Sequence, residues 1–182
     1  PLPLCHLARA KRSPLFRDVA AVGYCATKEE YYWGLHGHLV ISRTGVMTSL
    51  TATAANIDER VALFDVIENI QGLLIGDKGY ISQGLHDDLQ QYRAIDLQTP
   101  LRANMTETRS PQWVRHLIST RRLVETVIGQ LTERFHIQKV RARDLWHLTS
   151  RMRRKILAHT MGVFLNTTLG REPLQFDGLI TD

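Results

Sequence analysis

The segment LLIGDKGY, residues 73–80, constrains the fold most, because a short apolar run leads directly into an acid. Residues 73–75 have the length and composition of a buried strand, and Asp77 follows between Gly76 and Gly79. A loop acid after a strand is common in any α/β protein. Open sheets, however, display their active-site groups at the carboxyl ends of strands. Asp77 is therefore a candidate site residue, with the loop acid as the alternative.

The rest of the chain predicts a mixed α/β fold, with helices on the faces of a sheet. Runs of aromatic, β-branched and apolar residues predict strands over four segments, of which the first two form a hairpin: 31–42, 46–55, 73–77 and 94–101. Helices are expected from Asn56 or Asp58 to about Ile70, over 82–92 with Ser82 as its cap, along a stripe from Val114 to Phe135, and over 144–169. Residues 1–27, with three prolines, are predicted to be irregular or turn-rich.

Length and composition favour a single globular domain over residues 1–182. The chain has a mass of 20.8 kDa, with 43% hydrophobic and 23% charged residues, which is typical of soluble proteins. No apolar run approaches the ~20 residues of a membrane helix, and the first residues lack a signal-peptide pattern. Two cysteines, Cys5 and Cys25, provide no disulfide framework, so a cytoplasmic protein without membrane contact is expected.

The net charge of +5 is concentrated in the second half of the chain. Residues 115–155 hold 11 Lys and Arg against three acids. This distribution suits a polyanionic partner, because neutralisation of phosphates supplies most non-specific affinity for nucleic acid. A solvated basic helix face explains the charge alone equally well. The candidate contacts to nucleic acid are Lys78, Arg122 and a basic cluster on the 144–169 helix: Arg151, Arg153, Arg154 and Lys155.

Arg121 and Glu125 lie four residues apart in RRLVETVIGQL, so they share one face of the expected helix. Alone, such a pair is typical of a surface salt bridge. An acid after a strand, an acid on a later helix and a basic region are together the ingredients of a metal-dependent phosphoryl-transfer site. Two divalent ions ~4 Å apart serve such chemistry, and Mg²⁺ prefers carboxylate and water ligands. Asp77 and Glu125 could supply two of these ligands.

Two other kinds of site find little support. Five potential zinc ligands match no closed zinc site in their spacing: Cys5, His6, Cys25, His36 and His38. The phosphate loop G-x-x-x-x-G-K-[ST] of many nucleotide hydrolases is absent from the sequence.

The motifs described above resemble a bacterial insertion-sequence transposase of the DDE type. The matching segments, in order, are PLPLC (1–5), GYCATKEEYYWGLHGHLV (23–40), GDKGY (76–80) and RRLVETVIGQLTERF (121–135). The resemblance implies a ribonuclease H-like fold. It also implies that the metal ions, Mg²⁺ or Mn²⁺, are bound by three acids: one on the first strand, one in a G-D-x-x-Y element and the glutamate of an R-x3-E helix. Asp77 and Glu125 match the last two, and Arg121 is the arginine of R-x3-E.

The sequence departs from the family pattern in two places. The family's first aspartate lies a few residues before the P-x-P-x-C element, which begins this sequence, so no residue here matches it. The resemblance therefore implies an N-terminally truncated domain, with its first strand largely missing. Positions that often hold tyrosine and lysine in the family are Ile118 and Thr132 here.

The function implied by the resemblance is metal-dependent DNA cleavage and strand transfer at the ends of an insertion sequence. The resemblance also implies that the protein binds double-stranded DNA and forms a homodimer. It further implies association with the nucleoid when the protein is bound to DNA. Asp77 would be presented to a metal by a buried strand, with glycines that let the backbone turn beside it. Two alternatives stay open: a catalytically inactive, DNA-binding transposase remnant, and a non-enzymatic α/β interaction module.

Overall fold

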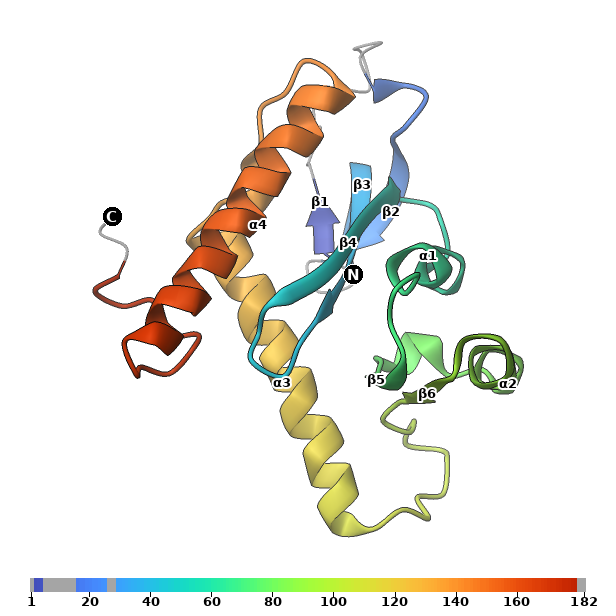
Figure 1. Ribbon diagram of the computed structural model, residues 1–182. Helices are drawn as coiled ribbons and strands as arrows, with labels where there is room; N and C mark the ends of the chain where they lie inside the picture. Colours follow the sequence, from blue (N-terminus) through green and yellow to red (C-terminus); the bar gives the residue numbers. More distant parts are fainter. Residues whose placement is uncertain (1, 5–15, 26–28, 180–182) are drawn as a thin grey trace.

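The computed structural model describes residues 2–4, 16–25 and 29–179 of the chain (Figure 1). Its strands are β1 (Leu2–Leu4), β2 (Ala21–Cys25), β3 (Glu30–Ile41), β4 (Met47–Ala54), β5 (Gly72–Ile75) and β6 (Ile95–Gln98). Its α-helices are α1 (Glu59–Val66), α2 (Gln83–Arg93), α3 (Pro111–Glu133) and α4 (Leu145–Thr168), and two short 3₁₀ helices are η3 (Lys78–Tyr80) and η4 (Ile137–Lys139). The predicted mixed α/β class is confirmed, and the arrangement is consistent with a ribonuclease H-like fold.

The described strands form two hydrogen-bonded groups. β3 pairs antiparallel with β1, β2 and β4, and β5 pairs parallel with β6, with Leu74 opposite Leu97. The predicted β3–β4 hairpin is confirmed, and Gly45 adopts a φ of 83° in its turn. Such a positive φ suits glycine, which has no Cβ to clash with the backbone.

The prediction that residues 1–27 are irregular is wrong for two segments. Residues 2–4 and 21–25 are strands, and both pair with β3. A proline is tolerated in β1 because this short strand pairs with β3 alone among the described strands. In β2 the alternation of side chains that marks a strand is obscured by Gly23. This position must be small, because a Cβ there would lie 2.6 Å from that of Ala55. Pro1 and Pro14 lie outside the described residues.

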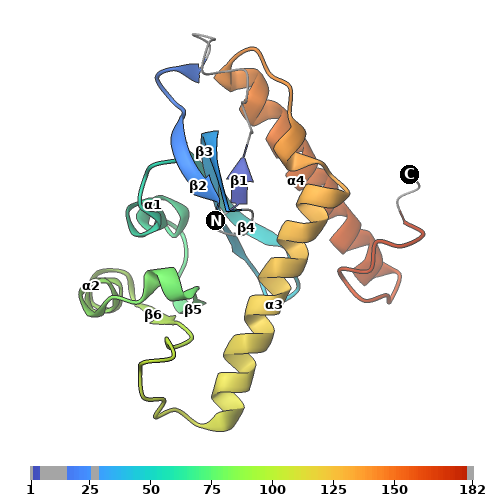
Figure 2. The ribbon, with the colours of Figure 1, turned by 180° about the vertical axis from the view of Figure 1, so that it is seen from behind.

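Helices cover both faces of the antiparallel sheet (Figures 1 and 2). α3 and α4 lie on one face and α1 on the other. The larger core joins β3 to α3 and α4 through these buried residues: Leu35, Val127, Leu131, Leu148 and Met152. A second core joins α1 and α2 to β5 and β6 through another set: Leu63, Val66, Ile67, Leu85, Leu89, Ile95 and Leu97. α1 therefore connects the parallel strand pair to the antiparallel sheet.

Asp58 and Ser82 precede α1 and α2 as the predicted capping residues, and Asp144 precedes α4. Each of the three side chains accepts a hydrogen bond from a backbone N–H of the first turn. α3 begins after Ser110, whose hydroxyl accepts from the N–H of Trp113. Of the described helices, none combines the length and hydropathy that crossing a membrane requires.

The expectation that β5 is a buried strand is wrong. Leu73 is 48% exposed, and Leu74 and Ile75 are half-buried. Among the described strands β5 pairs only with β6, so no neighbouring strand covers its other edge.

Replacing Gly162 of α4 by alanine should destabilise the protein. A Cβ at this position would lie 2.2 Å from the ring of Phe176, which is 1% exposed and packs edge-on against Phe135. Overpacking costs about 1–3 kcal/mol, which exceeds the ~1 kcal/mol by which alanine is the better helix residue. Urea unfolding followed by circular dichroism measures the change. Gly129→Ala in α3 is the matched control: nothing lies within 4 Å of its Cβ, so it should stabilise the protein. Equal stabilisation by both substitutions would contradict the packing of Phe176 on α4.

Two buried histidines should make the protein less stable in acid. Desolvation lowers the pKa of His38 and of His159 from 6.5 to about 4. The unfolded chain keeps the ordinary value, so protons bind it first, and stability present above pH ~6.5 is lost as the pH falls towards 4. His159→Leu should reduce this loss between pH 7 and pH 4.5 by about 2 kcal/mol, measured by urea unfolding. An identical loss in the variant would refute the assignment to His159.

Candidate active site

Asp77 stands at the carboxyl end of β5, where the chain enters η3. Its Oδ1 accepts a hydrogen bond from the backbone N–H of Lys78 at 2.7 Å, so the carboxylate caps the 3₁₀ turn. The end of β5, Gly76 and the hydrogen bond at the start of η3 therefore set the position of the Asp77 side chain.

The glycines beside Asp77 act through close packing rather than through the turn that the sequence suggested. Neither Gly76 nor Gly79 has a positive φ. A Cβ on Gly76 would lie 3.2 Å from Leu97 and 3.3 Å from Tyr80, and one on Gly79 would lie 3.1 Å from a carboxylate oxygen of Glu59. Their small size lets η3 approach β6 and α1.

α3 brings the other two predicted residues to the same place. Leu117 is 1% exposed, and Val127 and Leu131 are fully buried, so both halves of the helix are anchored in the protein. Arg121 and Glu125 lie between these anchors on the solvent-exposed side of the helix.

The structure brings Asp77, Arg121 and Glu125 together, although 47 residues separate the two acids. Arg121 Nε lies 3.6 Å from Asp77 Oδ1 and 3.4 Å from Glu125 Oε1. The two carboxylate oxygens are therefore at most about 7 Å apart. The predicted convergence of the two carboxylates holds in the structure.

The group is open to solvent and strongly polar. The side chains of Asp77, Arg121 and Glu125 are 48%, 43% and 60% exposed. Burial raises the pKa of the neighbouring Tyr80 phenol, and the carboxylates of Glu59 and Asp77 raise it further, so this hydroxyl stays protonated at neutral pH. Within the described part of the chain, no cluster of three or more acidic, histidine or cysteine side chains forms a metal site. Asp77, at the end of β5, and Glu125, on α3, provide two carboxylate ligands from separate elements.

A cleft of about 430 Å³ adjoins the site. Most of its lining residues are apolar, and its basic lining residues are Lys78, Arg102, Arg109 and Arg121. Arg109 is held in place, because its guanidinium donates to Glu107 at 2.7 Å, to Gln98 at 3.2 Å and to the Thr99 carbonyl at 3.1 Å. The hydrogen bonds from Arg109 lower the pKa of Glu107 to about 2.

Arg102 and Arg109 were not among the predicted site residues. Both belong to the polar segment between β6 and α3, which sequence analysis treated only as a connection. The positive charge of these two residues could have marked them as candidates. The sequence of a loop, however, does not show which part of the protein the loop contacts. The contact of Arg109 with Gln98 and Thr99, at the end of β6, brings this segment beside Asp77.

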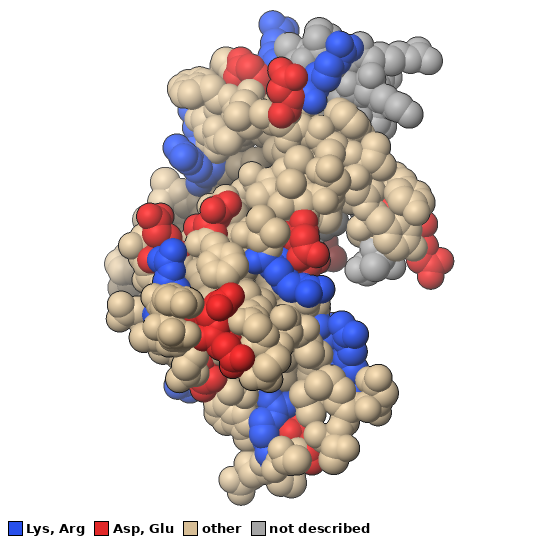
Figure 3. Space-filling model, turned by 90° about the vertical axis from the view of Figure 1, so that its right-hand side faces the viewer, with Lys and Arg blue, Asp and Glu red and all other residues tan. Residues whose placement is uncertain are grey.

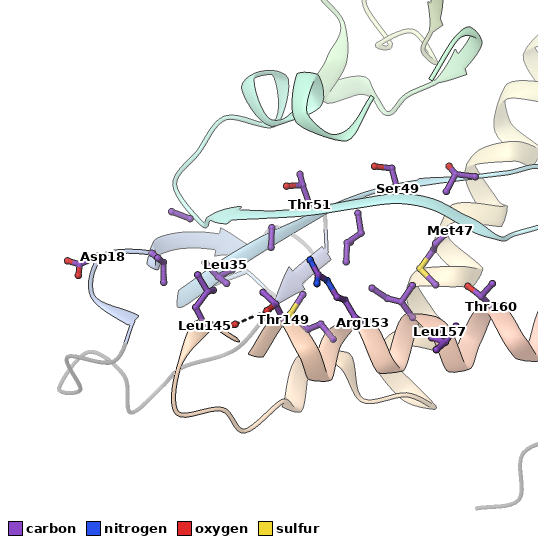
Figure 4. A pocket seen from close by; sticks show the side chains of 17 residues that line it. Asp18, Leu35, Met47, Ser49, Thr51, Leu145, Thr149, Arg153, Leu157 and Thr160 are labelled. Atoms are coloured by element: carbon purple, nitrogen blue, oxygen red, sulfur yellow. Dashed lines mark hydrogen bonds between the residues drawn. The ribbon is translucent and has the colours of Figure 1, made fainter. Parts of the chain in front are cut away.

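The other predicted contacts to nucleic acid are spread over several surfaces. Lys78 lines the cleft beside the site, and Arg122 is exposed on α3. Figure 4 shows Arg153 reaching from α4 towards β4, within a cleft of about 810 Å³ between the two. The ammonium of Lys155 donates to the Phe135 carbonyl, and Arg154 is exposed. Arg151 lines a third cleft, near the start of α4.

The surface over α1 and α2 has the opposite character. Residues 56–93 hold seven acids and three bases, and Figure 3 shows acidic side chains gathered on this side of the molecule. The positive charge of the protein therefore lies mainly on α3, α4 and the segments next to them.

The sequence model of one protein family, described as Transposase DDE domain, matches residues 1–145. The chain belongs to the transposase DDE domain family. The match contains Asp77, Arg121 and Glu125 and ends where α4 begins. No curated protein and no solved structure matches the chain. Membership implies transposase activity in general, of the nuclease or transferase kind, on a DNA substrate, and such domains generally use divalent metals.

The ion pairs of Arg121 with Asp77 and Glu125 should contribute little to the stability of this transposase domain. Exposed pairs contribute about 1 kcal/mol or less, and less still at high salt. A double-mutant cycle with Arg121→Gln and Glu125→Gln, measured by urea unfolding, should give a coupling in that range. Leu117→Ala, one helical turn away but buried, should cost about 2–5 kcal/mol. A coupling of several kcal/mol would mean that the pair itself holds α3 in place.

Proposed function

We propose that this transposase domain cleaves and joins DNA strands at the ends of an insertion sequence, in a reaction that depends on Mg²⁺ or Mn²⁺. The observation that carries the proposal is the pair of carboxylates, Asp77 and Glu125, within about 7 Å of each other at the end of a strand. Two-metal sites hold their ions ~4 Å apart, so oxygens at this spacing suit a shared pair of ions. Carboxylates are also the ligands that Mg²⁺ prefers.

Each residue has a distinct proposed role. Asp77 and Glu125 hold the divalent ions, which when bound activate the attacking oxygen and stabilise the leaving one. Arg121 offsets the repulsion between the two carboxylates, orients Glu125 and can contact a DNA phosphate. Tyr80 stays neutral, so it adds no charge beside Asp77.

The charge distribution supports DNA as the substrate. Lys78 and Arg102 line the cleft that adjoins the carboxylates, where they can contact the backbone on either side of the scissile phosphate. The acidic surface over α1 and α2 repels DNA, so we place the duplex along α3 and α4, where Arg122 and the basic residues of α4 lie. We further propose that residues 1–182 act as one domain within a homodimer, located in the bacterial cytoplasm and associated with the nucleoid when bound to DNA.

The matching amide variants test the metal ligands. In a form of the chain extended at its N-terminus by a strand with the family's first aspartate, we expect Asp77→Asn and Glu125→Gln to abolish Mn²⁺ binding, followed by electron paramagnetic resonance, and Mn²⁺-dependent nicking of supercoiled DNA. DNA binding should be nearly unchanged, because an amide keeps the size of the side chain but loses the charge that holds divalent cations. Glu133→Gln removes an exposed acid from the same helix and is the control that should change neither. Cleavage that survives Asp77→Asn would place the chemistry elsewhere.

The same assay separates the active enzyme from a DNA-binding remnant. Two carboxylates leave a two-metal site short of ligands, so the chain from Pro1 to Asp182 should bind DNA and nick it poorly or not at all. The same chain, extended at its N-terminus by a strand with an aspartate at the family position, should gain nicking. Binding without nicking in both forms would support the remnant, and no DNA binding would support an interaction module.

A further inference from the structure

A second cationic cleft lies away from the carboxylates, where the chain enters α4. Its volume is about 500 Å³, and it is lined by Arg141, Ala142, Arg143, His147 and Arg151. Figures 1 and 2 place the segment before α4 at one end of the molecule, whereas β5, β6 and the segment between β6 and α3 lie towards the other end. The cleft is therefore separate from the candidate active site.

Among the described residues, no acid pairs with the three arginines of this cleft. In that part of the chain the side chains of Arg141, Arg143 and Arg151 take part in no ion pair or hydrogen bond, and all three residues are exposed. Asp144 is the one acid between residues 139 and 155, and its carboxylate is already engaged. It accepts hydrogen bonds from the backbone N–H of His147 at 2.8 Å and from its Nδ1 at 2.7 Å.

The chemistry of the cleft fits a phosphate group. Guanidinium groups present paired N–H donors that match phosphate oxygens, and the cleft gathers three of them from two segments of the chain. The first turn of α4 adds the positive end of a helix dipole. Three unneutralised cations around one cavity favour an anion there.

An exposed aromatic residue beside the cleft points to a polymer rather than a small anion. Trp146 is 70% exposed, and the centroid of its ring lies 4.9 Å from that of His147, which lines the cleft. An indole in solvent offers a flat apolar face for a base or sugar, which free phosphate lacks. Phosphate-binding and base-binding groups thus lie side by side.

We propose that this arginine cleft holds backbone phosphates of DNA, with Trp146 against the same strand, as a second DNA contact remote from Asp77 and Glu125. The inference rests on the proposed function, because it assumes that the domain acts on DNA. It adds a place that the family match does not assign, since Arg151 and Trp146 lie beyond residue 145.

The test measures binding of duplex DNA over a range of salt concentrations, in the Asp77→Asn background so that cleavage plays no part. The test variant replaces the three cleft arginines: R141Q, R143Q and R151Q. The control removes the same charge from the β3–β4 turn, α1 and α2: R43Q, R60Q and R93Q. At moderate salt the cleft variant should lose at least about tenfold in affinity, and its log–log salt slope should fall by about 0.9 per lost phosphate contact. The control should stay within about twofold of the background.

Tryptophan fluorescence identifies the occupant. DNA should change the emission of the background protein, and Trp146→Phe or the cleft variant should remove that change. Inorganic phosphate, at the same phosphate concentration, should not reproduce it.

Equal affinities in the cleft and control variants would overturn the cleft while leaving the proposed function intact. An equal fluorescence response to inorganic phosphate would make the cleft a small-anion site instead. A background protein that binds no DNA at all would overturn the proposed function together with this inference.

Discussion

The repulsion between Asp77 and Glu125 is the constraint on which the site depends. Two carboxylates within about 7 Å of each other are unfavourable unless a cation offsets their charge, and Arg121 lies within 4 Å of both. All three side chains are exposed, so water screens the group and these pairs are too weak to fix its geometry. The geometry comes instead from α3, whose buried residues Leu117 and Val127 lie on either side of Arg121 and Glu125. A well-packed helix thus holds a weakly paired charge group beside β5.

Local signals in the sequence predicted the elements that depend on local physics. Capping side chains marked the starts of two helices, and the hairpin followed from two β-rich segments around a glycine turn. Arg121 and Glu125 were found from their spacing on one helix, and Asp77 from its place after an apolar run. Their convergence could be expected only from the family resemblance, because no local pattern relates residues 77 and 125.

The features that sequence analysis missed depend on contacts between distant segments. β2 pairs with β3 and lies so close to Ala55 that position 23 must be small, and Gly76 and Gly79 are small because Leu97, Tyr80 and Glu59 occupy the space around them. β5 was expected to be buried because its residues are apolar, but exposure depends on neighbouring strands, which composition does not reveal. The basic residues of α4 were grouped by sequence proximity, yet a helix turns about 100° per residue and sends neighbours in different directions. Arg153 faces β4, and Arg151 joins two arginines of the preceding segment.

The weakness of the ion pairs suits the metal binding that we propose for this group. A buried, fully paired Arg121 would hold its carboxylates so firmly that exchange for another cation would leave uncompensated charge inside the protein. At 43–60% exposure, water would compensate each group while partners change, so the metal binding that we propose for Asp77 and Glu125 would cost little. The guanidinium of Arg121 would then stay on α3, at the edge of the cleft that it lines with Lys78 and Arg102. There it can pair with a phosphate, so the charge that separates the carboxylates in the free protein would serve the substrate in the complex.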